Sequence, residues 1–205
     1  MRLDLKRLKN AELPTRWDLG NEVLYRLCEQ HPHHTNEDEI LAKIWLVGRS
    51  YSAAIERRRE SREIGGEAFY TSVVGPKMRR AKIDNWLAPL LRYSRPTIEN
   101  CVELIDTHKR LTDLFRDITG LEKRSLASKY LHFHFRNLFY IYDSRAVQSL
   151  ATLAPRLKDL PVLRNYDRVY ATHFVKSLTF VETIERDHGI YLNPRKLDDY
   201  LLGLI

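Results

Sequence analysis

The chain has 205 residues, of which 43% are hydrophobic and 30% are charged, a composition that excludes intrinsic disorder and allows a sizeable core. Lys and Arg number 34 against 27 Asp and Glu, so the net charge is +7, which favours a polyanionic partner such as nucleic acid. The N-terminal residues lack the apolar run of a signal peptide, and no apolar run is as long as a membrane span. We therefore expect a cytoplasmic protein without membrane contact.

The first half of the chain has apolar residues at helical spacing and lacks the alternation typical of strands. A first helix is expected from residue 18 or 20 to residue 30. Its predicted core-facing residues are Val23, Leu24, Leu27 and Cys28. Asn36 is predicted to cap the next helix, because its side-chain oxygen can accept a backbone N–H. The expected elements that follow are a helix over 37–61, a break at 65–66, a short helix, a break at 75–76 and a helix over 77–91.

The second half continues the helical pattern. Helices are expected over residues 96–118 and 125–136, followed by an extended apolar segment at 138–142. The remaining expected elements are a helix from Asp143 to residue 154, a loop at 155–161, and helices over 166–188 and 194–202. Because the breaks are short, the pattern predicts one all-α domain over residues 1–205, a helical globule that is either one unit or two packed lobes.

The residue types that commonly bind metals are not grouped in this sequence. Cys28 and Cys101 lie in apolar helical patterns, without Cys or His neighbours at the spacing of a zinc site. Both are expected to be buried free thiols. The sequence also lacks a glycine-rich phosphate loop and a His-Glu-x-x-His motif. We therefore expect neither a metal nor a cofactor.

Two further groups of residues have a predicted place in the packing. Trp17, Trp45 and Trp86 lie in apolar contexts and are expected to anchor the core. Arg49 and Glu56 fall near one face of the expected helix, beside apolar neighbours. They are expected to form a partly buried ion pair, which is either structural or lines a pocket.

The helix expected over residues 125–136 has two unlike sides. At 100° per residue, one arc of polar residues contains Ser125, Ser128, Lys129, His132 and Arg136. The opposite side contains Leu126, Ala127, Tyr130, Leu131, Phe133 and His134. The polar arc is basic and begins beside the turn that precedes the helix, so it is a candidate functional surface. His134 is expected to be a core histidine with one satisfied ring nitrogen.

The order of elements around this helix resembles that of the helix-hairpin-helix DNA glycosylase superfamily. Ser125 opens the helix, and Asp143 follows eighteen residues later, after an extended connector. This spacing is similar to the adenine-mismatch branch, in which Ser stands in place of the Schiff-base lysine. Residues 125–133 and 141–145 also resemble a bacterial branch with 8-oxoguanine-glycosylase-like folds, some of whose members lie near defence genes. For that branch the likeness extends to residues 17–21 and 42–51.

The resemblance implies roles for three residues. It implies that Asp143 stabilises the developing sugar cation or activates water, and that the target nucleotide is extruded from the duplex. The plain alternative is that Asp143 only caps the helix beginning at Ser144. Lys129 is a candidate amine nucleophile, and the alternatives are an ion pair with Asp143 or a phosphate contact. His132 either transfers a proton or hydrogen-bonds Asp143.

The hairpin that this family uses to bind phosphate is degenerate in the chain. The turn from Gly120 to Arg124 has one glycine, out of register, and Glu122 would repel a phosphate. Lys123 and Arg124 are expected to contact phosphate by charge instead. Two other basic clusters, at residues 57–62 and 79–82, are either a phosphate-binding patch or solvated helix ends. The predicted nucleic-acid-binding residues are Arg57, Arg58, Arg62, Arg79, Arg80, Lys123, Arg124, Ser125, Arg136 and Arg145.

These observations leave three functional hypotheses open. The first is a DNA glycosylase or glycosylase/lyase that excises a modified or mismatched base, with Asp143 catalytic and Lys129 and His132 assisting. The second is a non-catalytic nucleic-acid-binding or adaptor protein, with protein partners from the same operon and a role in bacterial antiphage defence. The third is a protein that binds a free nucleobase or nucleotide. The sequence leaves the oligomeric state open.

Overall fold

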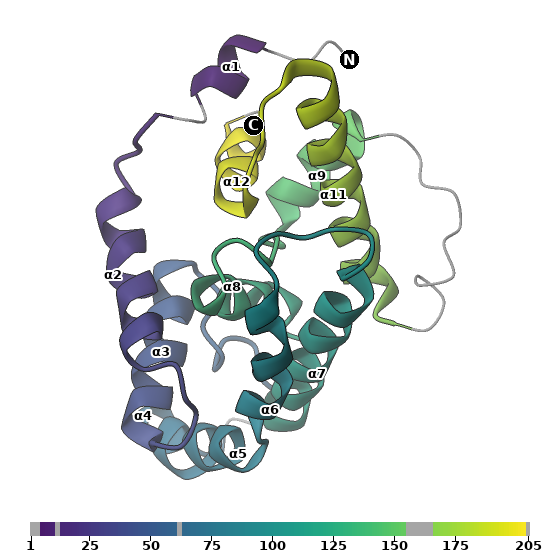
Figure 1. The fold of residues 1–205 in the computed structure, drawn as a ribbon. Helices are drawn as coiled ribbons and strands as arrows, with labels where there is room; N and C mark the ends of the chain where they lie inside the picture. The colour runs from purple at the N-terminus through teal and green to yellow at the C-terminus, as the bar shows by residue number, and fades with distance from the viewer. Residues whose placement is uncertain (1–4, 11–12, 61–62, 155–165, 204–205) are drawn as a thin grey trace.

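The computed structural model describes residues 5–10, 13–60, 63–154 and 166–203, and every regular element in these ranges is a helix (Figure 1). The all-α prediction is confirmed. The helices of the first half are α1 (Leu5–Asn10), α2 (Asp18–Gln30), α3 (Glu37–Ser50), α4 (Gly66–Phe69), α5 (Gly75–Arg80) and α6 (Ile83–Leu87). Those of the second half are α7 (Cys101–Thr119), α8 (Arg124–His134), α9 (Ser144–Leu153), α11 (Arg168–His188) and α12 (Pro194–Leu202).

Helix α2 covers the predicted range, but its buried face differs in part from the predicted one. Leu24 and Cys28 are buried, whereas Val23 is exposed. Asn21 and Tyr25 take part in the buried face instead. These two polar side chains were not expected inside, because their hydrogen-bond partners lie far along the chain and left no local signal.

Helix α3 begins as predicted, with the Asn36 side chain accepting a hydrogen bond of 2.9 Å from the Asp38 amide. It ends at Ser50, so the prediction of a helix to residue 61 was wrong. Ser52 and Arg58 both have left-handed backbone conformations, with φ of 52° and 58°. The chain folds back so closely that a side chain at Gly48 would meet the Ala54 backbone at 3.0 Å. Residues 51–60 therefore form a tight loop, although their apolar residues recur at the spacing of a helix.

The segment from Gly66 to Arg80 is continuously helical, so the predicted break at residues 75–76 was wrong. A π-helical turn, η1 (Tyr70–Val74), lies between α4 and α5. Pro76 lies directly after this π-helical turn, at the start of α5. The expected helix over 77–91 is instead divided at Lys82, whose φ is 54°, into α5, α6 and a 3₁₀ turn, η2 (Ala88–Arg92).

Helix α8 lies in the middle of the molecule and contacts α2, α3 and α7 (Figure 1). Its residues from Leu126 to Phe133 are all buried. The predicted polar arc is therefore mostly internal and does not form a surface, because Ser128, Lys129 and His132 are buried. Helix periodicity separates polar from apolar residues, but it does not decide which side faces water.

The extended segment 138–142 follows α8 as predicted, and Leu138 to Ile141 are buried. Side chains satisfy its backbone groups, as buried peptide groups require. The Phe139 carbonyl accepts a hydrogen bond of 3.0 Å from His132, the Ile141 carbonyl accepts one of 3.0 Å from His173, and the Tyr142 amide donates one of 3.0 Å to Ser128. This segment fixes α8 relative to α11.

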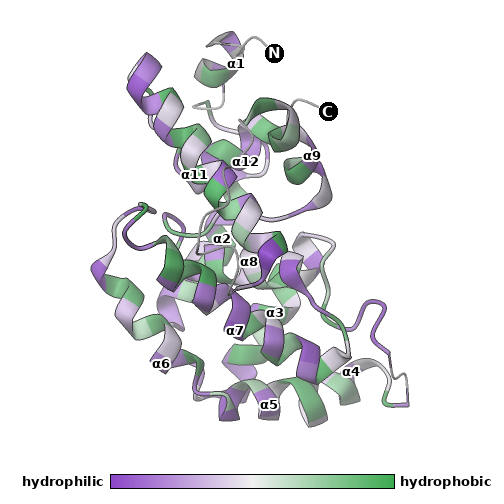
Figure 2. Ribbon diagram, turned by 90° about the vertical axis from the view of Figure 1, so that its right-hand side faces the viewer, coloured by the Kyte–Doolittle hydropathy of each residue, from purple (hydrophilic) through white to green (hydrophobic). Residues whose placement is uncertain are grey.

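Helices α9, α11 and α12 form one end of the molecule, and α3 to α6 form the other (Figure 1). Figure 2 shows hydrophobic and hydrophilic residues alternating along most helices, as expected for helices with one face in a core. Both cysteines are buried free thiols, as predicted. Trp86 packs against the core, but Trp17 and Trp45 are exposed, so the prediction that they are core anchors was wrong. The loop predicted at residues 155–161 lies outside the described residues.

Candidate functional site

Lys129 lies on α8 with only 4% of its surface exposed. Its ammonium group donates a hydrogen bond of 2.9 Å to the hydroxyl of Ser125, one turn earlier, and lies 3.5 Å from the Tyr51 carbonyl. The aromatic ring of Tyr51 lies beneath it, 5.7 Å from the nitrogen to the ring centre. Burial lowers the pKa of this amine, while the negative charges of Asp143 and Asp198 act against that change. The amine is thus dehydrated and held by a neutral hydroxyl.

Asp143 is the N-cap of α9, and its side chain accepts a hydrogen bond of 2.8 Å from the Ala146 amide. The capping role considered for this residue is therefore present. Within the described residues, no carboxylate oxygen of Asp143 lies within 4 Å of the Lys129 amine, so the ion pair considered as one alternative for Lys129 does not form. The charge of Asp143 still acts on the Lys129 amine. A capping carboxylate and a buried amine therefore face one region of the molecule.

His132 does not contact Asp143 as predicted. One ring nitrogen lies 3.0 Å from the Phe139 carbonyl, to which it must donate, so the other accepts a hydrogen bond of 2.6 Å from the Tyr25 hydroxyl. The ring is fully buried, and burial lowers the pKa of His132 to about 3. A histidine that stays neutral at physiological pH, with both nitrogens occupied, is a structural connection between α2 and segment 138–142. This arrangement disfavours the proton-transfer role considered for His132.

His134 was expected in the core with one satisfied ring nitrogen. Its ring packs at a tilt against those of His34 and Tyr130, at ring-centre distances of 5.1 and 4.9 Å. Its Nε2 atom is buried and has no hydrogen-bond partner among the described residues. Burial lowers the pKa of His134 well below the usual value for histidine. His134 therefore belongs to an aromatic cluster between α8 and the loop before α3, away from Lys129.

Helix α12 contributes charged residues that sequence analysis missed. Arg195 donates hydrogen bonds of 2.9 Å to the Tyr51 hydroxyl, 3.4 Å to Asp198 and 2.7 Å to Asp199. Asp198 is buried, and its Oδ1 atom has no hydrogen-bond partner among the described residues. The only sequence signal was an Arg followed by acids at i+3 and i+4, a pattern that is typical of an exposed helix face.

Asp198 interacts electrostatically with both cations of this region, Arg195 and Lys129. Burial raises the pKa of Asp198 to about 7, and Asp143 and Asp199 add to the increase, whereas Arg195 and Lys129 oppose it. A carboxyl group with this pKa can hold or release a proton near neutral pH. Lys129, Asp143, Asp198, Arg195 and Tyr51 are called the Lys129 cluster below.

Four of the predicted nucleic-acid-binding cations are engaged by the protein itself. Arg79 pairs with Glu37 at 2.9 Å, and Arg124 pairs with Asp167 at 2.6 Å. Arg136 pairs with Glu29, and the Lys123 ammonium group donates to the Arg57 carbonyl. These partners reduce the positive charge that the four residues offer to a phosphate. The phosphate contacts predicted for these four residues therefore compete with contacts inside the protein.

The other predicted cations are placed differently. The exposed residues among them are Arg57, Arg58, Arg80 and Arg145. Arg62 lies outside the described residues. Ser125 is half-buried, and its hydroxyl accepts the hydrogen bond from Lys129. Exposed arginines therefore occur on the 51–60 loop, at the end of α5 and at the start of α9.

The turn between α7 and α8 is acidic as well as basic. Gly120 ends α7 in a left-handed conformation with φ of 78°, and its amide donates 2.8 Å to the Arg116 carbonyl. The side chain of Glu60 lies against this glycine, and Glu122 pairs with Arg124. These two carboxylates would repel a phosphate from the backbone amides of the turn. This agrees with the degenerate hairpin seen in the sequence.

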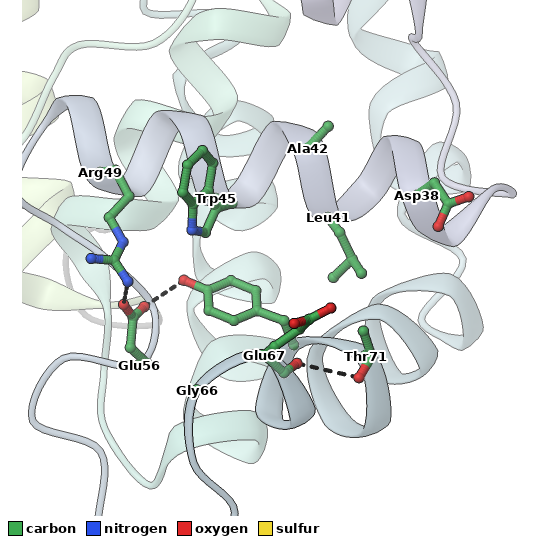
Figure 3. Close-up of a pocket in the computed structure, with 10 residues that line it drawn as sticks. Asp38, Leu41, Ala42, Trp45, Arg49, Glu56, Gly66, Glu67 and Thr71 are labelled. Carbon is green, nitrogen blue, oxygen red and sulfur yellow. Dashed lines mark hydrogen bonds and ion pairs between the residues drawn. The ribbon is translucent and has the colours of Figure 1, made fainter.

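A second region lies between α3 and α4 and encloses a pocket of about 580 Å³ (Figure 3). The predicted ion pair between Arg49 and Glu56 is confirmed, and it lines this pocket. The Tyr70 hydroxyl donates to the second oxygen of Glu56. The pair was expected to be either structural or part of a pocket. It is both, because it holds the 51–60 loop and forms a wall of the pocket.

Comparisons of the chain with family models, curated proteins and solved structures gave no significant match. No helix among the described residues is long and apolar enough to cross a membrane. The described residues also contain no group of three or more His, Cys, Asp or Glu side chains arranged to hold a metal ion. The geometry of these two regions is therefore the basis for assigning a function to the chain.

Proposed function

We propose that the chain is a DNA glycosylase-type enzyme that acts on an extruded nucleotide with Lys129 as the amine and Asp143 as the charge-stabilising carboxylate. One observation carries the proposal: an almost fully buried lysine amine is held by the hydroxyl of Ser125, while its neighbouring carboxylates stay beyond ion-pair distance. A desolvated amine without a tight carboxylate partner has the properties of a lysine nucleophile. The order of α8, extended segment and capping aspartate, which resembles the glycosylase superfamily, supports the same conclusion.

The chemistry that this cluster offers is substitution at the C1′ carbon of a nucleotide. The Lys129 amine forms a bond to C1′ as the glycosidic C–N bond breaks, and the base leaves with the bonding electrons and takes up a proton. Asp143 stabilises the positive charge that develops on the sugar. The proton lost by the amine passes through a neighbouring carboxylate to the departing base. Opening of the sugar ring then breaks the bond from C1′ to the ring oxygen, which takes up the second amine proton, and leaves an imine. Because Lys129 is buried, this reaction requires the side chains above it to move when DNA binds.

Borohydride trapping tests the proposal. The protein is incubated with duplexes that contain 8-oxoguanine, uracil, an A–G mismatch or an abasic site, and the imine is reduced to a stable adduct. We expect an adduct with at least one duplex, lost in Lys129→Ala and kept in Lys123→Ala, a lysine that donates a hydrogen bond to the Arg57 carbonyl and lies outside the Lys129 cluster. An adduct that survives in Lys129→Ala, or no adduct and no released base with any duplex, overturns the proposal.

A non-catalytic nucleic-acid-binding protein is the second candidate function. The observation that favours it is the set of exposed arginines, Arg57, Arg58, Arg80 and Arg145, on a chain of charge +7. Such a protein would bind DNA with an affinity that falls steeply with salt, and it would release no base. Measuring the salt dependence of binding beside the trapping assay separates the two candidates, because only the enzyme yields a product.

A further inference from the structure

The pocket between α3 and α4 lies on the opposite side of α3 from α8. The residues of α3 that line it are Asp38, Leu41, Ala42, Trp45 and Arg49, which recur at helical spacing on one face. The opposite face of α3 is buried and includes Ile40, Ile44 and Val47. The pocket, of about 580 Å³, is within the size range of small-molecule sites. It is therefore separate from the Lys129 cluster.

One end of this pocket offers hydrogen-bond donors in a fixed position. Glu56 binds an amino group of Arg49 through one oxygen and the Tyr70 hydroxyl through the other (Figure 3). More than half of the Arg49 side chain is exposed. Since a guanidinium group has five N–H donors and Glu56 occupies one amino group, donors remain for a ligand. The hydrogen bond to Glu56 anchors one amino group of Arg49 at this end of the pocket, and the planar guanidinium group can bind two adjacent acceptors in bidentate fashion.

The rest of the pocket offers a flat aromatic surface and acceptors. The Trp45 side chain is 47% exposed and lines the pocket, although its type normally packs inside or at an interface. Figure 3 shows Arg49 and Glu56 at one end of the row of lining side chains, Asp38 at the other end, and Glu67 between them. Glu67 is exposed on α4, so its carboxylate is available to accept hydrogen bonds. Donors, a stacking surface and acceptors thus lie in one cavity.

We propose that this pocket binds a 6-oxopurine of the guanine type, as the free base or the nucleoside. The carbonyl O6 and N7 of guanine are adjacent acceptors that match the Arg49 guanidinium. Its N1–H and amino group are donors that match a carboxylate such as Glu67, and the ring stacks on Trp45. Adenine has an amino group in place of O6 and no N1–H, so it meets Arg49 with a donor and Glu67 with an acceptor. The site therefore distinguishes the two purines.

Calorimetric titration with guanosine and with adenosine tests this proposal on the full chain. We expect saturable one-to-one binding of guanosine and at least tenfold weaker binding of adenosine. Trp45→Leu is expected to weaken guanosine binding about tenfold, because stacking on an aromatic side chain contributes on the order of 1–3 kcal/mol per base. Trp17→Leu is the matched control, since Trp17 is also exposed but lies at the start of α2, outside the pocket. Circular dichroism verifies that both variants are folded.

Three results would overturn the proposal. They are the absence of saturable guanosine binding, equal losses in Trp45→Leu and Trp17→Leu, and tighter binding of spermidine than of guanosine. The last result would mean that the acidic lining attracts cations in general. The titration is independent of the glycosylase proposal, because it contains no DNA and Lys129→Ala is expected to bind guanosine like the unmodified chain. Failure of one proposal is therefore distinguishable from failure of the other.

Discussion

Lys43 and Lys129 are two buried lysines on neighbouring helices, and their surroundings differ. The Lys43 ammonium group donates hydrogen bonds of 2.6 and 2.8 Å to the carbonyls of His31 and His33, where the chain leaves the C-terminus of α2. Lys129 has one hydroxyl at 2.9 Å and a carbonyl at 3.5 Å. Burial lowers the pKa of both amines. The comparison indicates that Lys43 closes a loop, whereas Lys129 retains hydrogen-bonding capacity for a ligand.

The largest expected effect concerns the stability of the two lysine variants. Lys43→Met leaves two carbonyls without a donor and is expected to destabilise the fold by about 3 kcal/mol. Lys129→Met is expected to change stability by less than about 1 kcal/mol, because an apolar side chain of similar length can replace a weakly bonded buried cation. Urea unfolding monitored by circular dichroism measures both. Equal losses would contradict the distinction and make Lys129 a structural residue like Lys43.

Asp143 is a carboxylate whose negative charge acts on Lys129, and its charge can be removed without removing its role as a helix cap. Asp143→Asn is expected to keep the stability of α9, because Asn and Asp are equally good N-caps. Base release is expected to fall by about 100-fold, since the charge that stabilises the sugar cation is lost. Single-turnover assays and thermal unfolding measure the two properties. Asp143→Ala is the control for the cap and is expected to cost about 1 kcal/mol of stability.

The third prediction concerns pH and Asp198, whose pKa is raised from 3.8 to about 7 by burial. A carboxyl group whose pKa is higher in the folded state favours folding below pH 3.8, and this contribution is lost as the pH rises toward 7. Asp198→Asn should remove this loss. The stability of the variant relative to the unmodified chain should therefore increase by about 3 kcal/mol between about pH 4 and pH 7. A pH-independent difference in urea midpoints would contradict this assignment.

The smallest expected effect concerns Ser125, which holds the Lys129 amine. Ser125→Ala removes one hydrogen bond and should cost about 1 kcal/mol of stability. Because a bond to a hydroxyl oxygen favours the charged amine, its loss should lower the pKa of Lys129 further. The pH at which borohydride trapping is half-maximal should then move downward. An unchanged pH profile would show that the hydroxyl does not influence the amine.

Much of the fold was predictable from sequence, because helix formation leaves local signals. Asn36, Asp143 and Asn193 cap helices through their side chains. Gly120 ends α7 in the left-handed conformation that glycine favours. The missed boundary at residue 50 had no such signal, since a Ser and an Arg adopt left-handed conformations in the loop that follows. Long-range packing imposes these conformations, and the propensity of each residue does not indicate them.

The Lys129 cluster was predictable only in part. Lys129 and Asp143 were identified from their positions along the chain, and both lie in one region. Tyr51, Arg195 and Asp198 were missed because they come from segments more than 60 residues from Lys129. The assignment of His132 was wrong for the same reason, since its partner Tyr25 lies 107 residues away. Hydrogen bonds across such separations leave no periodicity to detect.

The side-chain bonds to segment 138–142 also determine how the molecule can open. His132 and Ser128 of α8 and His173 of α11 all bind this one segment. Separation of α8 from α11 would break either the two bonds from α8 or the one bond from α11, so the two helices are expected to respond to an incoming nucleotide together. Any gate above Lys129 must then be on its other flank, formed by Tyr51 and the 51–60 loop, whose exchange of amide hydrogens should change first when DNA is added.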